Sequence, residues 1–187
     1  MRVIAGKFRS RRLKGLGTLP IRPTSDRLRE TLFNVLGASL EGSFFIDVYA
    51  GTGAVGIEAI SRGARDAVFI ESNASAARLI RKNLESLGVR SGAELIETDA
   101  ARGLERMTAR RLLADFIFLD PPFQKIDELV EILELLDASH LLAPYGIIIA
   151  EHSRRAELPL RFTRLERSRL LEQGEAALSF YRLAAAA

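Results

Sequence analysis

The pattern that most constrains the fold of this chain is a buried strand that runs into a glycine-rich loop. Residues 44–48 are apolar apart from Asp47, residues 49–56 contain three glycines, and an apolar helix pattern follows at once. This order of strand, loop and helix is typical of the first turn of an open, mostly parallel sheet, in which ligands bind where the strands end. The sequence therefore predicts a doubly wound α/β fold.

The rest of the chain alternates between strand and helix patterns. Two late apolar segments joined by residues 172–175 predict a hairpin, so we expect a mostly parallel sheet with an antiparallel edge. We expect Thr24 or Ser25 to cap the first helix and Gly88 to end the second. The other expected strands are 67–70, 94–97, 116–119 and 147–150, the helices lie around 28–36, 77–87 and 126–136, and the hairpin pairs 165–171 with 177–183.

Acidic side chains mark the ends of three successive predicted strands: Asp47, Glu71 and Asp99. An acid at the first position suits an amino-acid ammonium group, the second can accept both hydroxyls of a ribose, and the third can receive an adenine amine. S-adenosylmethionine carries all three groups. A nicotinamide oxidoreductase stays open, because the glycine loop and Glu71 suit that cofactor equally well. The predicted cofactor site consists of Asp47, Gly51, Thr52, Gly53, Glu71 and Asp99.

A rigid turn follows the apolar run 116–119. Two consecutive prolines, Pro121 and Pro122, cannot continue a central strand or enter a helix, so the backbone must leave the sheet there. The turn fixes the Asp120 carboxylate beside the Pro121 carbonyl, and this pair of acceptors can hold both protons of the exocyclic amine of a base. Phe123 offers a face on which that base can stack. Asp120, Pro121, Pro122 and Phe123 are therefore the predicted catalytic residues.

Positive charge is concentrated at the start of the chain. Residues 1–22, which we call the arm, hold seven basic side chains and no acid. The rest of the chain holds 20 basic and 24 acidic residues, so the net charge of +3 is the sum of +7 in the arm and −4 elsewhere. Such a basic segment on a mildly acidic body is typical of phosphate binding. Apolar residues such as Val3 and Phe8 predict a short hairpin that aims the arginines. The predicted nucleic-acid contacts are Arg9, Arg11, Arg12 and Arg22.

Three segments of the first third resemble one enzyme family. They are residues 2–11 (RVIAGKFRSR), residues 22–36 (RPTSDRLRETLFNVL) and residues 47–64, followed by the acid and the Asp-Pro-Pro-Phe turn described above. These are similar to the RsmD-type 16S rRNA (guanine-N(2))-methyltransferases, and the resemblance covers nearly the whole length. Ser10 stands where the family usually has glycine, and Tyr49 where Phe or Cys is common.

This resemblance implies a class I S-adenosylmethionine-dependent methyltransferase fold that methylates the exocyclic amine of a guanine in 16S rRNA. It also implies that the arm contacts RNA within the small ribosomal subunit or a late assembly particle, and we expect a monomer. DNA adenine methylation is the main alternative, because the Asp-Pro-Pro-Phe turn suits both amines. A non-catalytic RNA-binding protein would account for the arm alone.

The composition of the chain excludes several kinds of site and of protein. The chain has no cysteine, which excludes disulfides, zinc–thiolate clusters and a cysteine nucleophile for methylation at pyrimidine carbon-5. Its two histidines, His140 and His152, are far apart in sequence, so no metal site is expected. No apolar run approaches the roughly 20 residues that span a bilayer, so we expect a cytoplasmic protein with no membrane contact. With 187 residues, the chain suits one methyltransferase domain at 23–187 that follows the arm.

Overall fold

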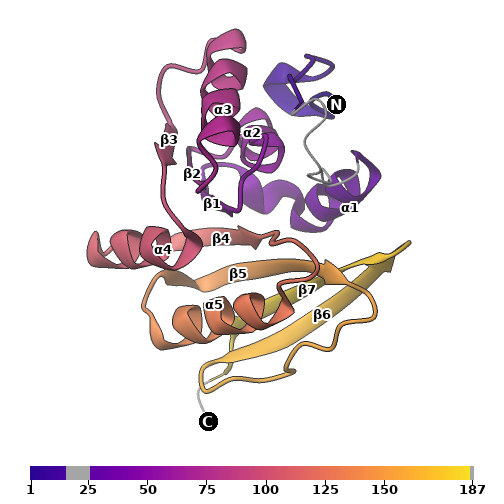
Figure 1. Ribbon diagram of the computed structural model, residues 1–187, viewed down its shortest axis with the longest axis vertical. Coiled ribbons are helices and arrows are strands. Elements are labelled where there is room, and N and C mark those ends of the chain that lie inside the picture. The colour runs from indigo at the N-terminus through magenta and orange to yellow at the C-terminus, as the bar shows by residue number, and fades with distance from the viewer. Residues whose placement is uncertain (16–25, 186–187) are drawn as a thin grey trace. The chain divides into compact units, whose positions relative to one another are not determined.

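The computed structural model describes residues 1–15 and 26–185 (Figure 1). The chain divides into two compact units, Met1–Asp99 and Ala100–Ala187. Three residues named above lie outside the described residues: Arg22, and the two candidates for the first helix cap, Thr24 and Ser25.

The first unit contains three parallel strands in the order β3-β2-β1. They are β1 (Phe44–Val48), β2 (Asp66–Ile70) and β3 (Ala93–Ile96). Val68 in the middle strand pairs with Ile46 on one side and Glu94 on the other. Their carboxyl ends therefore lie at one edge of the sheet, as the sequence predicts.

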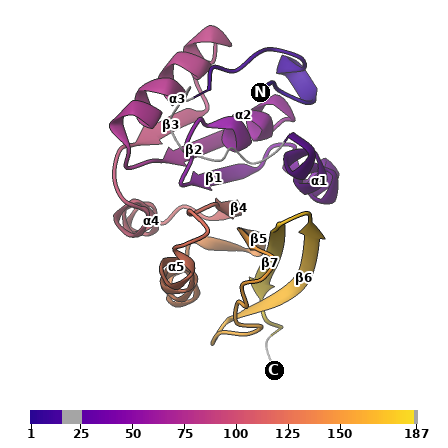
Figure 2. The ribbon, with the colours of Figure 1, turned by 45° about the vertical axis from the view of Figure 1, so that its right-hand side comes forward.

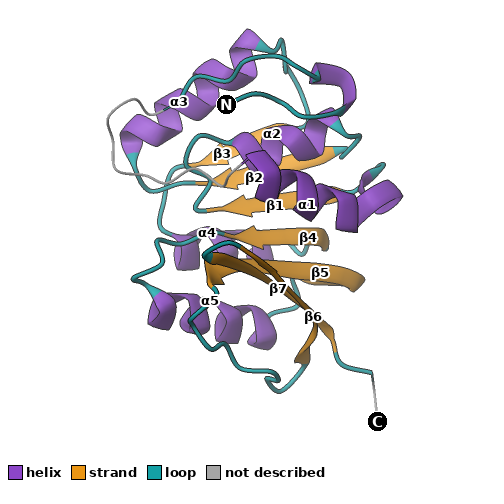
Figure 3. Ribbon diagram, turned by 90° about the vertical axis from the view of Figure 1, so that its right-hand side faces the viewer, coloured by secondary structure: helices purple, strands orange, loops and turns teal. Residues whose placement is uncertain are grey.

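Three helices accompany these strands: α1 (Asp26–Leu36), α2 (Ala54–Ser61) and α3 (Ala74–Ser86). A 3-10 turn, η2 (Gly37–Leu40), follows α1. Helix α2 lies across β1 and β2 (Figure 3), and it packs so closely that a Cβ at Gly56 would lie 2.4 Å from Cε1 of Phe69. Gly88, with a φ of +71°, follows the end of α3 and confirms the predicted stop.

The second unit is a four-stranded sheet in the order β4-β5-β7-β6. Strands β4 (Ala114–Leu119) and β5 (Leu142–Ser153) are parallel, whereas β7 (Ala176–Leu183) runs antiparallel to both β5 and β6 (Leu165–Gln173). The hairpin β6–β7, yellow in Figure 2, confirms the predicted antiparallel edge. Helices α4 (Ala100–Ala109) and α5 (Ile126–Ala138) pack against each other, and α5 contacts β5.

Two elements of the second unit differ from the sequence expectation. Strand β5 is longer than the apolar run 147–150, so Glu151 lies inside the strand and is buried rather than at its end. Helix α4 was not anticipated, because only Ala100, Leu104 and Met107 form its apolar stripe and Gly103 interrupts it.

Residues 1–15 of the arm belong to the first unit and form the expected short hairpin. Arg2 and Arg12 make an antiparallel bridge, and the 3-10 turn η1 (Gly6–Phe8) lies between them. The Val3 amide donates to the Arg11 carbonyl at 3.0 Å, and the Ser10 amide donates to the Val3 carbonyl at 2.9 Å. Ser10 has a φ of +67°, a conformation that glycine adopts more easily. The turn therefore forms even though serine replaces the glycine that the family usually has at this position.

Candidate functional site

The glycine loop, residues 49–56, is tightly curved at the carboxyl end of β1. Tyr49, Gly51 and Gly53 have φ values of +61°, +54° and +76°. The Gly53 amide donates to the Ala50 carbonyl at 2.7 Å, which closes the loop just before α2 begins. Because Tyr49 is not glycine, its left-handed backbone is strained, and strain of this kind is common where a loop must meet a ligand.

Glu71 connects the glycine loop to the end of β2. Its Oε2 accepts from the Gly51 amide at 2.7 Å, and its Oε1 accepts from the Asn73 amide at 2.7 Å. The residue is largely buried, with 9% of its surface exposed. A carboxylate offers about four lone-pair sites, and two remain for the hydroxyls of a ribose. The expected ribose contact stays a prediction.

Asp47 has a supporting role that the sequence did not reveal. It is 2% exposed, and its Oδ2 accepts from the Gly56 amide at 2.8 Å. That amide belongs to the first turn of α2, whose free N–H groups favour an anionic partner. Asp47 therefore holds the start of α2 in place, and its predicted contact with an ammonium group is untested.

Asp99 is exposed and directly precedes α4, three residues beyond the end of β3. The Glu71 amide donates to the Ile96 carbonyl at 3.2 Å, so the end of β3 lies beside the end of β2. The structure thus brings Asp47, Glu71 and the glycine loop together by direct hydrogen bonds, while Asp99 follows the neighbouring strand.

The Asp-Pro-Pro-Phe turn lies in the second unit and leaves β4 where the prolines predict. Strand β4 ends at Leu119, and the Lys125 amide donates to the Pro122 carbonyl at 2.8 Å before α5 begins. Pro121 is buried, Pro122 is exposed, and the side chains at 120 and 123 are half-buried. The turn therefore presents both an acid and an aromatic ring at intermediate depth, and their roles with a base remain predictions.

The arm is held on the first unit by side chains that the sequence did not single out. Glu58 is fully buried in α2, and its carboxylate accepts from the amides of Ile4 and Ala5 at 2.8 and 3.0 Å. Arg62 donates to the same carboxylate at 2.7 Å. A lone acid within the apolar helix 54–61 is the signal that could have found Glu58, because a buried charge needs partners.

The three described arginines of the predicted RNA contact, Arg9, Arg11 and Arg12, are all exposed. Arg11 has an additional role, because its Nη2 donates to the Ser86 carbonyl at 2.8 Å at the end of α3. A cation at a helix carboxyl terminus is favourable, so this contact helps to dock the arm. Arg9 and Arg12 are thus the better candidates for contacts to phosphate.

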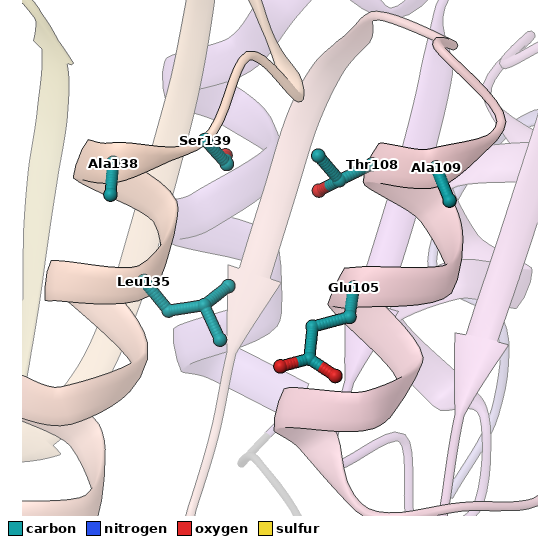
Figure 4. Close-up of a pocket in the computed structure, with 6 residues that line it drawn as sticks. All are labelled: Glu105, Thr108, Ala109, Leu135, Ala138 and Ser139. Carbon is teal, nitrogen blue, oxygen red and sulfur yellow. The ribbon is translucent and has the colours of Figure 1, made fainter.

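A groove of about 360 Å³ lies between the last turns of α4 and α5 (Figure 4). It is lined by Glu105, Thr108, Ala109, Leu135, Ala138 and Ser139. Helix α5 starts next to the Asp-Pro-Pro-Phe turn and ends at this groove, so the two lie at opposite ends of a helix about 20 Å long. The groove is therefore separate from the candidate base-binding turn.

Within residues 1–15 and 26–185, no group of three or more His, Asp or Glu side chains could hold a metal ion. No helix in the same part of the chain is long and apolar enough to cross a membrane.

Several proteins with similar sequences are named as ribosomal RNA methyltransferases. The family model described as Conserved hypothetical protein 95 matches residues 1–182. The chain is 37% identical over 159 residues to YlbH of Bacillus subtilis, with 85% of this chain and 86% of that protein covered. It is 34% identical over 159 residues to ribosomal RNA small subunit methyltransferase D of Escherichia coli, with 85% and 78% covered.

Solved structures are similar over most of this chain. The structure of yhhF from Escherichia coli has 32% identity and a TM-score of 0.85, and the match covers 100% of this chain and 99% of that one. SMU.776, solved in complex with SAH, has 14% identity and a TM-score of 0.66 over 84% of this chain and 48% of that one. The second likeness concerns the fold alone. Together they confirm the expected Rossmann-like class I methyltransferase fold.

Proposed function

Because the chain belongs to the family described as Conserved hypothetical protein 95, the RsmD-type family, we propose that it methylates the exocyclic N2 amine of a guanine in 16S rRNA. The named relative from Escherichia coli acts on small-subunit ribosomal RNA, which supports the class of substrate. The observation that carries the proposal is the hydrogen-bonded edge in which Glu71 meets Gly51 at the carboxyl ends of parallel strands.

The donor in this proposal is S-adenosylmethionine, which supplies an electrophilic methyl group on its sulfonium. The residues of the first unit fit it: Glu71 keeps acceptor sites for the ribose, and Asp99 is exposed for the adenine amine. Asp47 supplies negative charge for the ammonium group while it also supports the glycine loop. Gly51 and Gly53 allow the backbone to approach the ligand closely, and Thr52 is held between them in the same loop.

In this proposal, the Asp-Pro-Pro-Phe turn binds the acceptor base. A stacked guanine cannot present its amine for in-line attack, so the base must be turned out of its stack, and Phe123 provides an alternative ring. Asp120 and the Pro121 carbonyl accept the two amine protons, and Pro122 keeps that carbonyl in a fixed direction. With S-adenosylmethionine bound, the amine nitrogen would bond to the methyl carbon as the C–S bond breaks, S-adenosylhomocysteine would leave, and the extra proton on the nitrogen would pass to Asp120 or to water.

The arm provides the affinity for RNA, and residues 23–187 form the methyltransferase domain. Arg9 and Arg12 are exposed, and residues 1–22 contain no acidic side chain. Both arginines are therefore suited to phosphate contacts. Arg22 lies outside the described residues, and its proposed RNA contact rests on the sequence alone. We place the protein in the cytoplasm, as a monomer that acts on the small ribosomal subunit or a late assembly particle.

The deciding experiment is nucleoside mass spectrometry of ribosomal RNA from cells with and without the gene. The proposal predicts that one N2-methylguanosine in 16S rRNA is lost without the gene and restored by the purified protein with S-adenosylmethionine. Restoration should fail with the Asp120→Ala variant. Methylation of DNA adenine without any change in 16S rRNA would overturn the guanine assignment.

A further inference from the structure

Asn83 joins the arm to the glycine loop. This α3 side chain is fully buried, and its Oδ1 accepts from the Lys14 amide at 2.8 Å. Its Nδ2 donates to the Lys14 carbonyl at 3.1 Å and to the Thr52 carbonyl at 3.0 Å. A side-chain amide has one oxygen and two N–H donors, so one donor and two acceptors as partners fix its orientation and occupy both N–H groups.

The other end of the arm reaches the same loop residue. The Thr52 hydroxyl donates to Sδ of Met1 at 3.7 Å, and the Leu13 amide donates to the Met1 carbonyl at 3.2 Å. The two sides of the arm hairpin therefore meet at Thr52, one through Met1 and the other through Lys14 and Asn83. Thr52 is 9% exposed, so these contacts are largely shielded from solvent.

This arrangement makes the position of the loop depend on the position of the arm. If the arm leaves α3, the buried Asn83 amide loses two of its three partners, and Thr52 loses its contact with Met1. A buried polar group without its partner is costly, so the loop and the arm are more stable together than apart. Two sites that share such an element influence each other equally in both directions.

We propose that Asn83 is a positioning residue that couples the arm to the glycine loop. Docking of the arm fixes Thr52, so RNA on the arm strengthens cofactor binding, and a cofactor in the loop in turn holds the arm in place. The identities of the two ligands rest on the proposed function. Coupling between two sites in proteins is commonly about 5- to 150-fold, and we expect the lower part of that range.

The test compares Asn83→Ala with Ser61→Ala. Ser61 holds the same arm, because its hydroxyl donates to the Ala5 carbonyl and accepts from the Phe8 amide, but these contacts do not involve Thr52. Affinity for a fluorescent 16S rRNA transcript is measured with and without saturating S-adenosylhomocysteine. The wild type and Ser61→Ala should bind RNA at least about fivefold more tightly with the nucleoside, whereas the ratio should fall to about one in Asn83→Ala. An unchanged ratio in Asn83→Ala would overturn the proposal.

A second measurement uses the unaltered protein and no RNA, so it holds even if Asn83→Ala fails to fold. S-adenosylhomocysteine should slow amide hydrogen exchange in residues 11–15, which include the Lys14 amide bound by Asn83. Unchanged exchange there, with the nucleoside shown by calorimetry to be bound, would refute the coupling alone. Failure of the nucleoside to bind at all would instead count against the proposed function.

Discussion

Gly6 lies so close to Ser61 that a Cβ atom at residue 6 would be 1.8 Å from the Ser61 carbonyl oxygen. The obstacle is backbone, which cannot rotate away as a side chain can. Gly6 also has a φ of +78°, a conformation that other residues adopt only with strain. The arm therefore docks on the end of α2 at a distance that only glycine allows.

Gly6→Ala should release the arm from α2. We expect the free energy of unfolding to fall by about 1–3 kcal/mol, as for other overpacked sites, and RNA affinity to fall with it. Urea denaturation and an RNA-binding titration measure the two effects. Gly15→Ala is the matched control, because no atom lies within 4 Å of a Cβ at residue 15. Equal behaviour of the two variants would contradict the docking geometry.

Asp120→Ala should abolish most methyl transfer while leaving the cofactor site intact. The loss of one oriented acceptor at the reacting amine should cost about 2.7–4 kcal/mol of the barrier, or roughly 100- to 1,000-fold in turnover, by analogy with the removal of a preorganised donor. Affinity for S-adenosylhomocysteine, measured by calorimetry, should stay within about threefold. Near-normal turnover would show that Asp120 does not hold the base.

Glu71→Ala should weaken S-adenosylmethionine binding by about 1.5–3 kcal/mol, the range of hydrogen bonds to a charged group. The variant removes the proposed ribose contact and also the hydrogen bond to the Gly51 amide, and both losses should lower the affinity for the cofactor. Calorimetry measures the change, with Glu94→Ala on the exposed part of β3 as the control. Tight binding of a nicotinamide nucleotide to the wild type would favour the oxidoreductase instead.

Replacement of Arg9 and Arg12 together by alanine should make RNA binding less sensitive to salt. Each lost phosphate contact reduces the slope of log affinity against log salt by about 0.7–0.9, so the pair should reduce it by about 1.4–1.8. The effect should be independent of RNA sequence. Arg11→Ala should also lower the midpoint of urea unfolding, because its guanidinium bonds to the Ser86 carbonyl. An unchanged slope in the double variant would mean that Arg9 and Arg12 do not contact phosphates.

Stability should fall as the pH drops below about 6.5, because burial lowers the pKa of His152 from its ordinary value of 6.5. The ring contacts the Ser153 carbonyl and the Ser179 hydroxyl, both at 2.9 Å. Arg167 lowers the same pKa further, while the Ser153 carbonyl and Glu172 oppose the shift. The unfolded chain therefore takes up a proton near pH 6.5 that the folded chain does not, and this favours unfolding at lower pH.

Urea denaturation at pH 7.5, 6.5 and 5.5 measures this effect. His152→Gln should remove most of the difference between pH 7.5 and 5.5, whereas His140→Gln at an exposed position should preserve it. A wild-type difference that persists in His152→Gln would assign the pH dependence to other groups.

The parts of the fold that the sequence reveals are those with a strong local pattern. Strand β1 is buried at every position, so it reads as one apolar run, and the two prolines fix the end of β4 regardless of context. The roles of Glu58 and Asn83 depend instead on backbone groups 31 to 69 residues away. Pattern reasoning cannot supply such distant partners. The bond between Asp47 and the Gly56 amide spans only nine residues, but it depends on the curvature of the glycine loop, which the pattern does not give.

The contacts of the arm also impose an order on folding. Its amides donate to side chains of Glu58, Ser61 and Asn83, which lie 53 to 69 residues further along the chain. The positive φ of Ser10 also strains the turn of the hairpin, so the hairpin needs these contacts. The arm leaves the ribosome before α2 and α3 during synthesis, so it can complete these contacts only after both helices have emerged and folded. The basic segment assigned to ribosomal RNA becomes ordered late, when the surface that shapes it already exists.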